Sequence, residues 1–354
     1  METISNSKKN AEPNKDKQSN LEFFRIVLAF LIIIHHFIVH GVGYQSNAFT
    51  TNNIIAVALE PVGRMAVICF ALLSGYFLCD FTFKLEKFTK LILEMVFYTL
   101  IWFTVLTLTK QVPYSVDFLK YSVLPFLYGN WFLTCYLLIY LVSPLIKKVI
   151  IASTERELRF YTIGFYLLTS FICFLARNTL IEEWFTRPIL FMFWLFAGAW
   201  LRKGNYSINW KWRLIGITAF SIGACIRLAL LYSNSANADQ HDIDKYSSYF
   251  SPFLIMVALV LFLEFKGLRI KNNKIINGAS MTVLGIYLIH DNDYARITIW
   301  HTLLKTENYV NSPYFILYMF GCSALVFSIC FIADLIRKNI FEKSFFFLLY
   351  RTIN

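Results

Sequence analysis

The sequence predicts an all-α, polytopic integral membrane protein with about ten transmembrane helices and with both termini in the cytoplasm. Three observations support this fold class. The chain is 57% hydrophobic and only 16% charged, whereas soluble domains are about a quarter charged. Nearly uncharged apolar segments recur at the length that a bilayer requires. Lys and Arg gather in alternate gaps between those segments, which is the positive-inside pattern.

The apolar segments define the expected spans and, with them, the domains. The spans are 23–41, 54–79, 88–109, 124–146, 158–176, 188–202, 212–232, 250–266, 277–291 and 313–336. Two of them, 188–202 and 277–291, are short for a bilayer, so we expect them to be tilted, re-entrant or buried behind other helices. Residues 1–20 are polar and charged and predict a disordered cytoplasmic tail. A transmembrane domain over 21–341 and a cytoplasmic C-terminal tail over 342–354 complete the chain.

The charge distribution sets the orientation and bounds the partners. Basic residues crowd the N-terminal tail, the second, fourth, sixth and eighth gaps, and the C-terminal tail. Lys110 and Lys120 in one gap, and Arg177 and Arg187 in another, depart mildly from the pattern. The net charge of +11 is explained by loops that face anionic lipid headgroups, so it indicates a bilayer partner and requires no nucleic acid. The seven cysteines have no zinc-site spacing, and we predict no metal site.

The first span carries a cation and an imidazole on one face. Arg25 and His36 are eleven residues apart, which returns an α-helix to within about 20° and raises it by about 16 Å. Glu22 lies on the same stripe, whereas His35 lies about 80° away. Ionisable side chains are costly in lipid, so these residues are functional candidates. The alternative is that Arg25 reaches the headgroups and the histidines hydrogen-bond neighbouring helices.

The second span carries a further charged pair and a small-residue step. Glu60 and Arg64 are four residues apart and can pair on one helix face. They form either part of a site or a structural ion pair near the outer surface. Ser74 and Gly75 allow either close helix packing or the approach of a ligand to the backbone.

Five short motifs occur in an order that resembles the membrane-bound acyltransferase-3 family, whose members include surface-polysaccharide O-acetyltransferases. The motifs are Arg25 with His36 after ten intervening residues; Phe70 to Tyr76 around Ser74-Gly75; the basic pair Lys87 and Lys90; Asn130-Trp131-Phe132-Leu133 with Tyr136 and Tyr140 to Pro144; and Gly285-Ile286-Tyr287-Leu288-Ile289-His290. The sequence departs from the family's pattern at Lys87 and Lys90, where Arg is usual, and at Asn130. A lysine offers a point charge instead of the bidentate contact that Arg makes to phosphate.

The resemblance implies an acyl-CoA-dependent O-acyltransferase of the bacterial cell envelope, in the cytoplasmic membrane. It would move an acyl group, usually acetyl, from cytoplasmic acyl-CoA to a hydroxyl of a cell-surface or exported glycan or lipid-linked saccharide. Acetyl-CoA is then a donor substrate, and no bound cofactor is expected. His36 would act as general base or form an acyl-histidine.

The remaining roles follow from the resemblance and from the expected depth of each residue. Arg25 is the second catalytic candidate and, with Lys87, Lys90 and Ser74, would bind acyl-CoA; Glu22 would orient Arg25. The candidates for holding the acceptor or stabilising the transition state are Arg64, Glu60, Trp131, Tyr287 and His290. Anchoring at the membrane interface is the alternative role of Tyr287 and His290.

Two other functions are compatible with the sequence. A transporter or flippase of a lipid-linked saccharide would also use buried Arg and His, although residues 180–354 hold no counterpart of the Arg25–His36 pair. A non-catalytic subunit of a polysaccharide export complex is a third reading. Arg227 lies in a span without a supporting motif, and the acidic 233–249 loop is a candidate contact for an exported acceptor. The acceptor, the acyl length and the oligomeric state are not determined.

Overall fold

Every regular element of the described chain is a helix. The computed structural model describes residues 18–43, 50–112, 114–124, 131–175, 186–233, 244–293 and 295–342, and these ranges contain no strand. The predicted tails lie outside the described residues, except for 18–20 and 342. The all-α prediction is therefore confirmed for the described part of the chain.

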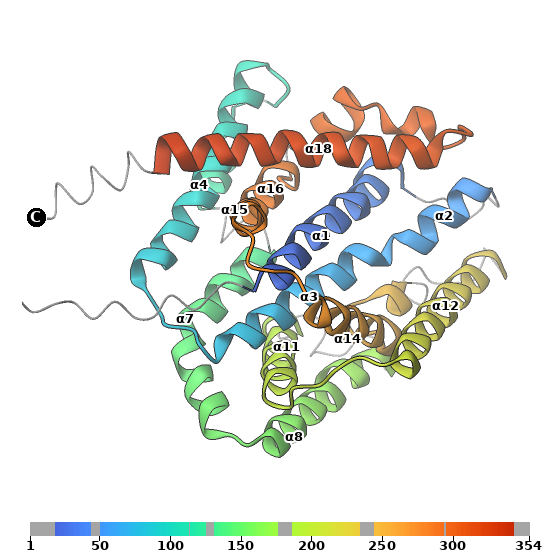
Figure 1. The fold of residues 1–354 in the computed structure, drawn as a ribbon. Coiled ribbons are helices and arrows are strands. Elements are labelled where there is room, and N and C mark those ends of the chain that lie inside the picture. The colour runs from blue at the N-terminus through green and yellow to red at the C-terminus, as the bar shows by residue number, and fades with distance from the viewer. Residues whose placement is uncertain are drawn as a thin grey trace, which may run out of the picture.

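The described elements are long α-helices together with shorter α, 3₁₀ and π segments (Figure 1). The first half holds α1 (Ser19–His36), the π-helix η1 (Phe37–Val42), α2 (Thr51–Leu59), α3 (Pro61–Leu78), α4 (Leu85–Leu108), α5 (Val116–Val123) and α7 (Trp131–Ala152). The middle holds α8 (Glu155–Phe165), η2 (Tyr166–Phe171), α9 (Ile172–Leu175), α11 (Thr186–Lys203), α12 (Trp210–Ser233), η3 (Lys245–Ser247) and α14 (Pro252–Gly267). The last part holds α15 (Lys274–Ala279), η4 (Ser280–Thr282), α16 (Val283–His290), α17 (Ala295–Ile297), η5 (Thr298–Leu303), η6 (Thr306–Tyr309), α18 (Phe315–Arg337) and η7 (Lys338–Glu342).

Within the described residues, seven helices are long and apolar enough to cross a membrane. They are Ser19–Val42, Thr51–Leu78, Leu85–Leu108, Trp131–Ala152, Trp210–Tyr232, Lys245–Gly267 and Phe315–Phe341. Of the other three expected spans, 188–202 lies within α11. The described part of 158–176, which ends at residue 175, contains η2, and residues 277–290 are divided among α15, η4 and α16. A multi-pass membrane protein follows, whereas ten crossings and cytoplasmic termini stay predictions.

A proline divides the second span and leaves a carbonyl for another helix to satisfy. Pro61 is the first residue of α3 and has no N–H, so the carbonyl of Val57, four residues earlier, loses its helical partner. The guanidinium of Arg227 on α12 donates to that carbonyl at 2.7 Å. This hydrogen bond connects α2 with α12, and Glu60 lies at the break between α2 and α3.

Two glycines let α3 and α11 pack backbone against backbone. A Cβ at Gly75 would lie 2.3 Å from the carbonyl oxygen of Leu195, and a Cβ at Gly198 would lie 2.2 Å from that of Leu72. Only glycine fits such an approach. The packing interpretation of Ser74-Gly75 is therefore confirmed, and the Ser74 hydroxyl donates back to the carbonyl of Phe70 at 2.9 Å.

α1 lies in the middle of the bundle and contributes to its two largest hydrophobic clusters. In Figure 1, α18 lies on one side of α1, and α14 and α12 lie on the other. Leu21, Phe24 and Leu28 pack with residues of α3, α11 and α14. Ile33 and Phe37 pack with residues of α16 and α18. The polar side chains of α1 are consequently held between helices on both sides.

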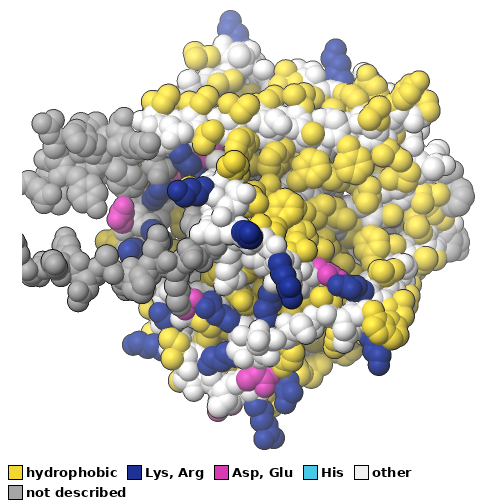
Figure 2. All heavy atoms as spheres, in the orientation of Figure 1, with side chains coloured by type: hydrophobic (Ala, Val, Ile, Leu, Met, Phe, Trp, Pro, Cys, Tyr) yellow, Lys and Arg dark blue, Asp and Glu magenta, His cyan; other side chains and the backbone are white. Residues whose placement is uncertain are grey.

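The surface separates apolar from basic regions (Figure 2). Hydrophobic side chains cover the middle and upper right of the visible face, whereas Lys and Arg gather toward its left and lower margins. Two basic side chains of α11 bind carbonyls near the ends of other helices: Lys203 binds the carbonyl of Ile150 near the end of α7 at 2.7 Å, and Arg202 binds that of Tyr76 near the end of α3 at 2.9 Å. Cations at helix C-termini complement the helix dipole.

Candidate functional site

A cavity of about 410 Å³ lies beside the end of α1. It is enclosed by α1 with η1, by α3, by the start of α7, and by the segments that follow η3 and α16. Its lining consists of three imidazoles, four aromatic rings, two carboxylates, one guanidinium and small or apolar residues. These residues are His35, His36, His40, Trp131, Phe132, Tyr249, Tyr287, Asp291, Asp293, Arg296, Ile32, Val39, Gly63 and Val67.

A chain of hydrogen bonds fixes the tautomer of His36. His290 on α16 holds its Nδ1 at 2.6 Å from the carbonyl of Ile286, one turn earlier. A carbonyl only accepts, so His290 Nδ1 carries the proton and its Nε2 carries a lone pair. His36 Nδ1 lies 2.9 Å from that Nε2 and donates to it. In neutral His36 the other nitrogen, Nε2, is therefore unprotonated and able to accept a proton.

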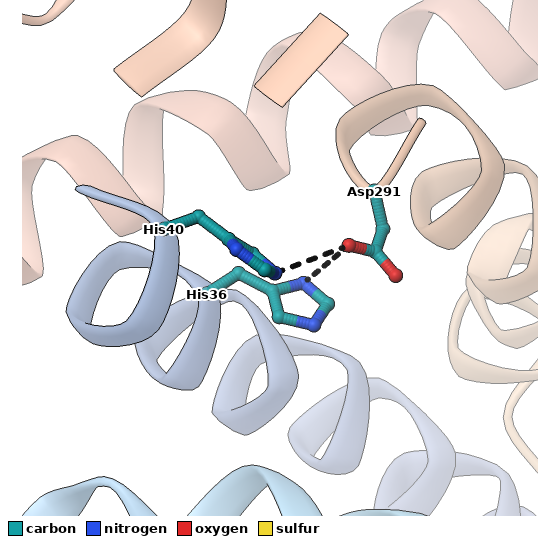
Figure 3. Close-up of side chains that lie close together, drawn as sticks. All are labelled: His36, His40 and Asp291. Atoms are coloured by element: carbon teal, nitrogen blue, oxygen red, sulfur yellow. Dashed lines mark ion pairs between the residues drawn. The ribbon is translucent and has the colours of Figure 1, made fainter. Parts of the chain in front are cut away.

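A buried carboxylate faces the same imidazole (Figure 3). Asp291 follows α16, and its Oδ1 lies 3.5 Å from His36 Nδ1 and 3.8 Å from His40 Nε2. Figure 3 shows His36 at the end of α1 and His40 on the following turn, in η1, both directed toward this carboxylate. A negative charge at this distance stabilises an imidazolium more than a neutral imidazole.

Arg296 holds the carboxylate in place. Its Nε donates to Asp291 Oδ1 at 2.8 Å. Its Nη1 lies 2.6 Å from Asp293 Oδ1. Burial lowers the pKa of Arg296, but the carboxylates of Asp291 and Asp293 outweigh it and hold the pKa above its ordinary value. Tyr121 donates to the other oxygen of Asp293 at 3.3 Å. Arg296 thus links the two carboxylates of the cavity lining and fixes the one that faces His36.

The ligand atoms of His36, His40 and Asp291 lie within 4.8 Å of one another, which a metal ion would also permit. Two contacts oppose that use. The oxygen of Asp291 nearest the histidines already binds Arg296, and His36 Nδ1 already binds His290. A cation would have to displace a guanidinium and a proton. The donor set suits proton transfer better than metal binding.

A second polar network lies behind His35. His35 Nδ1 donates to the carbonyl of Glu60 at 2.6 Å. The Glu60 carboxylate pairs with Arg64 at 3.1 Å and with Arg227 at 3.0 Å, and both Glu60 and Arg227 are only 1% exposed. A Cβ at Gly63 would lie 2.3 Å from His35 Cβ, so the imidazole needs a glycine beside it. The predicted Glu60–Arg64 pair exists, but neither residue lines the cavity.

The other predicted residues lie toward the start of α1 and α4. Arg25 pairs with Glu22 at 3.4 Å and lies 5.4 Å from the ring centre of Phe77. Glu22 also accepts from the hydroxyl of Ser280 on η4 at 2.5 Å, which ties α1 to the segment before α16. In the first two turns of α4, Lys87 is exposed and Lys90 is half-buried. The predicted orienting contact between Glu22 and Arg25 is thus present.

The structure brings together part of the predicted site. His36, Trp131 and Tyr287 line the cavity, and His290 binds His36 directly. Sequence reasoning missed the charged and imidazole groups that complete this cavity, which are Asp291, Asp293, Arg296 and His40. Tyr249, which also lines the cavity, belongs to the 233–249 loop that was named as a candidate acceptor contact, but it was not singled out. The available signal was the Asp-x-Asp-x-x-Arg sequence, which begins at the last residue of the short 277–291 segment.

The helices and the cavity define a class: a multi-pass membrane protein with buried acid–base groups at a cavity among its helices. The chain belongs to the acyltransferase-3 family, because residues 18–334 match the family described as an acyltransferase domain. The match includes α1, α16 and nearly all of α18. No curated protein and no solved structure matches the chain. The family supports acyltransferase activity over the transporter reading.

Proposed function

We propose that this protein is an integral-membrane O-acyltransferase that moves an acyl group, most simply acetyl, from cytoplasmic acyl-CoA to a hydroxyl of a cell-surface or exported glycan. His36 is the general base. The observation that carries this proposal is the hydrogen-bond chain from the Ile286 carbonyl through His290 to His36 Nδ1, which leaves His36 Nε2 free to take a proton. A general base needs this tautomer and an adjacent counter-charge, which Asp291 supplies.

The reaction balances with His36 alone as proton carrier. His36 Nε2 takes the proton of the acceptor hydroxyl while the hydroxyl oxygen attacks the thioester carbonyl. The carbon–sulfur bond then breaks, and the imidazolium returns the proton to the CoA thiolate. Asp291 stabilises the imidazolium between these two steps. An acyl-histidine intermediate is the alternative role of His36.

Arg296 is a better placed oxyanion partner than the predicted Arg64. Both guanidiniums are paired with carboxylates, but Arg296 lines the cavity and Arg64 does not. A fixed guanidinium stabilises the negative charge that develops on the thioester oxygen. In this proposal Arg64 holds the segment around Ser247 in place, and Arg296 makes the contact with the substrate.

The donor is proposed to enter from the cytoplasm at the start of α1. Arg25, Lys87 and Lys90 provide positive charge for its phosphates, and Ser74 lies on the facing helix α3. About 16 Å of helix separates Arg25 from His36, which is within reach of a pantetheine arm. The acceptor enters from the opposite side, where the cavity offers Trp131, Tyr287 and the carboxylates to a saccharide.

Purified protein in detergent tests the chemistry. The assay measures thiol release from acetyl-CoA with and without the de-O-acetylated envelope glycan of the native host. In the wild type, the glycan should accelerate this release. His36→Ala should lose at least about a hundredfold of that rate. Arg213→Ala, which removes an exposed arginine of α12 that is paired with Glu264, is the control and should retain it. Equal glycan-dependent rates in His36→Ala and wild type would remove His36 from catalysis.

Donor binding tests the cytoplasmic mouth separately. Arg25→Ala should weaken acetyl-CoA binding by roughly tenfold, because a charge-assisted phosphate contact is lost. Isothermal titration in detergent measures it, with Arg213→Ala, an exposed arginine of α12, as the control. Unchanged affinity would place the CoA site elsewhere.

A further inference from the structure

One wall of the cavity is formed by a short segment that the proposed chemistry does not use. Residues 245–250 contain η3 and lead into α14. Tyr249 lines the cavity, and its ring centre lies 5.5 Å from that of Trp131 at an interplanar angle of 61°. The two rings therefore form an aromatic corner, on a wall to which α1 does not contribute.

Arg64 fastens this segment to α3. Its guanidinium donates to the Ser247 hydroxyl at 2.6 Å and to the Ser247 carbonyl at 3.2 Å. The same guanidinium pairs with Glu60, which is itself paired with the buried Arg227 of α12. Ser247 is fully buried, and its hydroxyl donates in turn to the carbonyl of Asp244. Two residues after this anchored serine the chain presents Tyr249 to the cavity.

The chemistry of the corner fits a sugar ring. Two aromatic faces inclined at 61° to each other supply flat apolar surface, which suits the C–H face of a pyranose. The carboxylates of Asp291 and Asp293 line the same cavity and accept hydrogen bonds from sugar hydroxyls. An apolar platform with a few fixed polar groups is the usual composition of a small-ligand site.

We propose that Trp131 and Tyr249 form the platform for the pyranose ring that carries the acceptor hydroxyl, and that Arg64, through Ser247, is the positioning residue that sets the place of Tyr249. The inference rests on the proposed acyl transfer and deepens it. Arg64 lies outside the cavity lining and determines the affinity for the acceptor through the segment that it holds.

The test separates acceptor affinity from turnover. Purified variants transfer label from radioactive acetyl-CoA to increasing concentrations of de-O-acetylated envelope glycan from the native host. Tyr249→Ala should raise the KM for the glycan by roughly tenfold, with kcat changed by less than about threefold. Ser247→Ala, which removes one of the two Arg64 contacts, should raise the KM by about threefold.

The same segment offers a matched control. Tyr246 packs against Phe174 and Phe253 and does not line the cavity, so Tyr246→Ala should leave the KM for the glycan near the wild-type value. A double variant reports the positioning role: Ser247→Ala in a Tyr249→Ala background should add nothing, because the ring that Ser247 positions is already absent.

The outcomes separate this inference from the proposed function. Label transfer with an unchanged KM in Tyr249→Ala contradicts the platform. A Ser247→Ala effect on KM that persists in full in the Tyr249→Ala background contradicts the positioning role of Arg64. Absence of label transfer by the wild type contradicts the proposed function, and this inference with it.

Discussion

His36 owes its proposed role to neighbours that are far away in sequence. Its partner His290 is 254 residues distant, and Asp291 follows directly. Neither contact has a periodic signature in the sequence. The periodicity of α1 determines the direction of each imidazole. His36 faces α16, whereas His35 faces Glu60 at the start of α3. The separation of the two histidines on the helical wheel is confirmed by their different partners.

The carboxylate beside His36 is testable by charge removal. Asp291→Asn keeps the shape but no longer stabilises an imidazolium, so kcat should fall by about tenfold to a hundredfold. Steady-state acyl transfer measures it. Asp293→Asn is the control, because Asp293 binds the same Arg296 but is not paired with His36. If the Asn substitutions at positions 291 and 293 reduced kcat equally, the charge of Asp291 would have no special role beside His36.

The buried pair of Glu60 and Arg227 predicts a large stability effect. In Arg227→Met the buried Glu60 carboxylate keeps, among the described residues, only Arg64 as a cationic partner. The free energy of unfolding should therefore fall by roughly 3–5 kcal/mol. Thermal unfolding in detergent measures the loss. Arg213→Met on the same helix removes an exposed pair with Glu264 and should cost about 0–1 kcal/mol. An equal loss of unfolding free energy in the two variants would contradict a stabilising role of the buried pair.

At the scale of elements, breaks in the helices build the site. The kink at Pro61 frees the Val57 carbonyl for Arg227. At the end of α1, the π-helix η1 leaves carbonyls that side chains satisfy: His301 donates to the carbonyl of His40 and Thr306 to that of Gly41, both at 2.8 Å. Irregular helical turns of this kind are frequent at functional sites. Here they fix η1, which carries His40 and directly follows His36 at the end of α1.

The contact between α3 and α11 predicts an effect of a single methyl group. Gly198→Ala places a Cβ against the Leu72 carbonyl, so the helices must separate, at a cost of about 1–3 kcal/mol. Thermal unfolding in detergent measures the cost. Gly321→Ala on α18 meets no atom within 4 Å and should stabilise the protein by up to about 1 kcal/mol. A destabilisation no larger in Gly198→Ala than in Gly321→Ala would contradict the close approach.

For the whole molecule, the sequence predicts the helical class, the seven long spans and the first-helix stripe, because apolar length and helical periodicity are local properties. It does not predict how α16 meets α1, since that contact depends on packing between distant segments. The Asp291–Arg296 pair and the use of Arg64 as an anchor for η3 were missed for the same reason. The resemblance indicated His290 and Tyr287 but gave no geometry for either residue.

The orientation of the whole chain is tested by labelling. On a cysteine-free background, Asn308→Cys lies in a predicted outer gap and Lys271→Cys in a predicted cytoplasmic gap, and both positions are exposed. A membrane-impermeant maleimide added to intact cells should label position 308 and spare position 271, because charge bias sets topology. The reverse pattern would invert the proposed directions of donor and acceptor entry.

The most direct test of the central claim is the ester content of the envelope glycan in the native host. Strains that express wild type or His36→Ala at equal protein levels are compared by base-released acetate per unit of glycan. Because His36 is proposed to activate the acceptor hydroxyl, the His36→Ala strain should fall to the level of a strain that lacks the gene. Acetate equal to that of the wild type would contradict the catalytic role of His36.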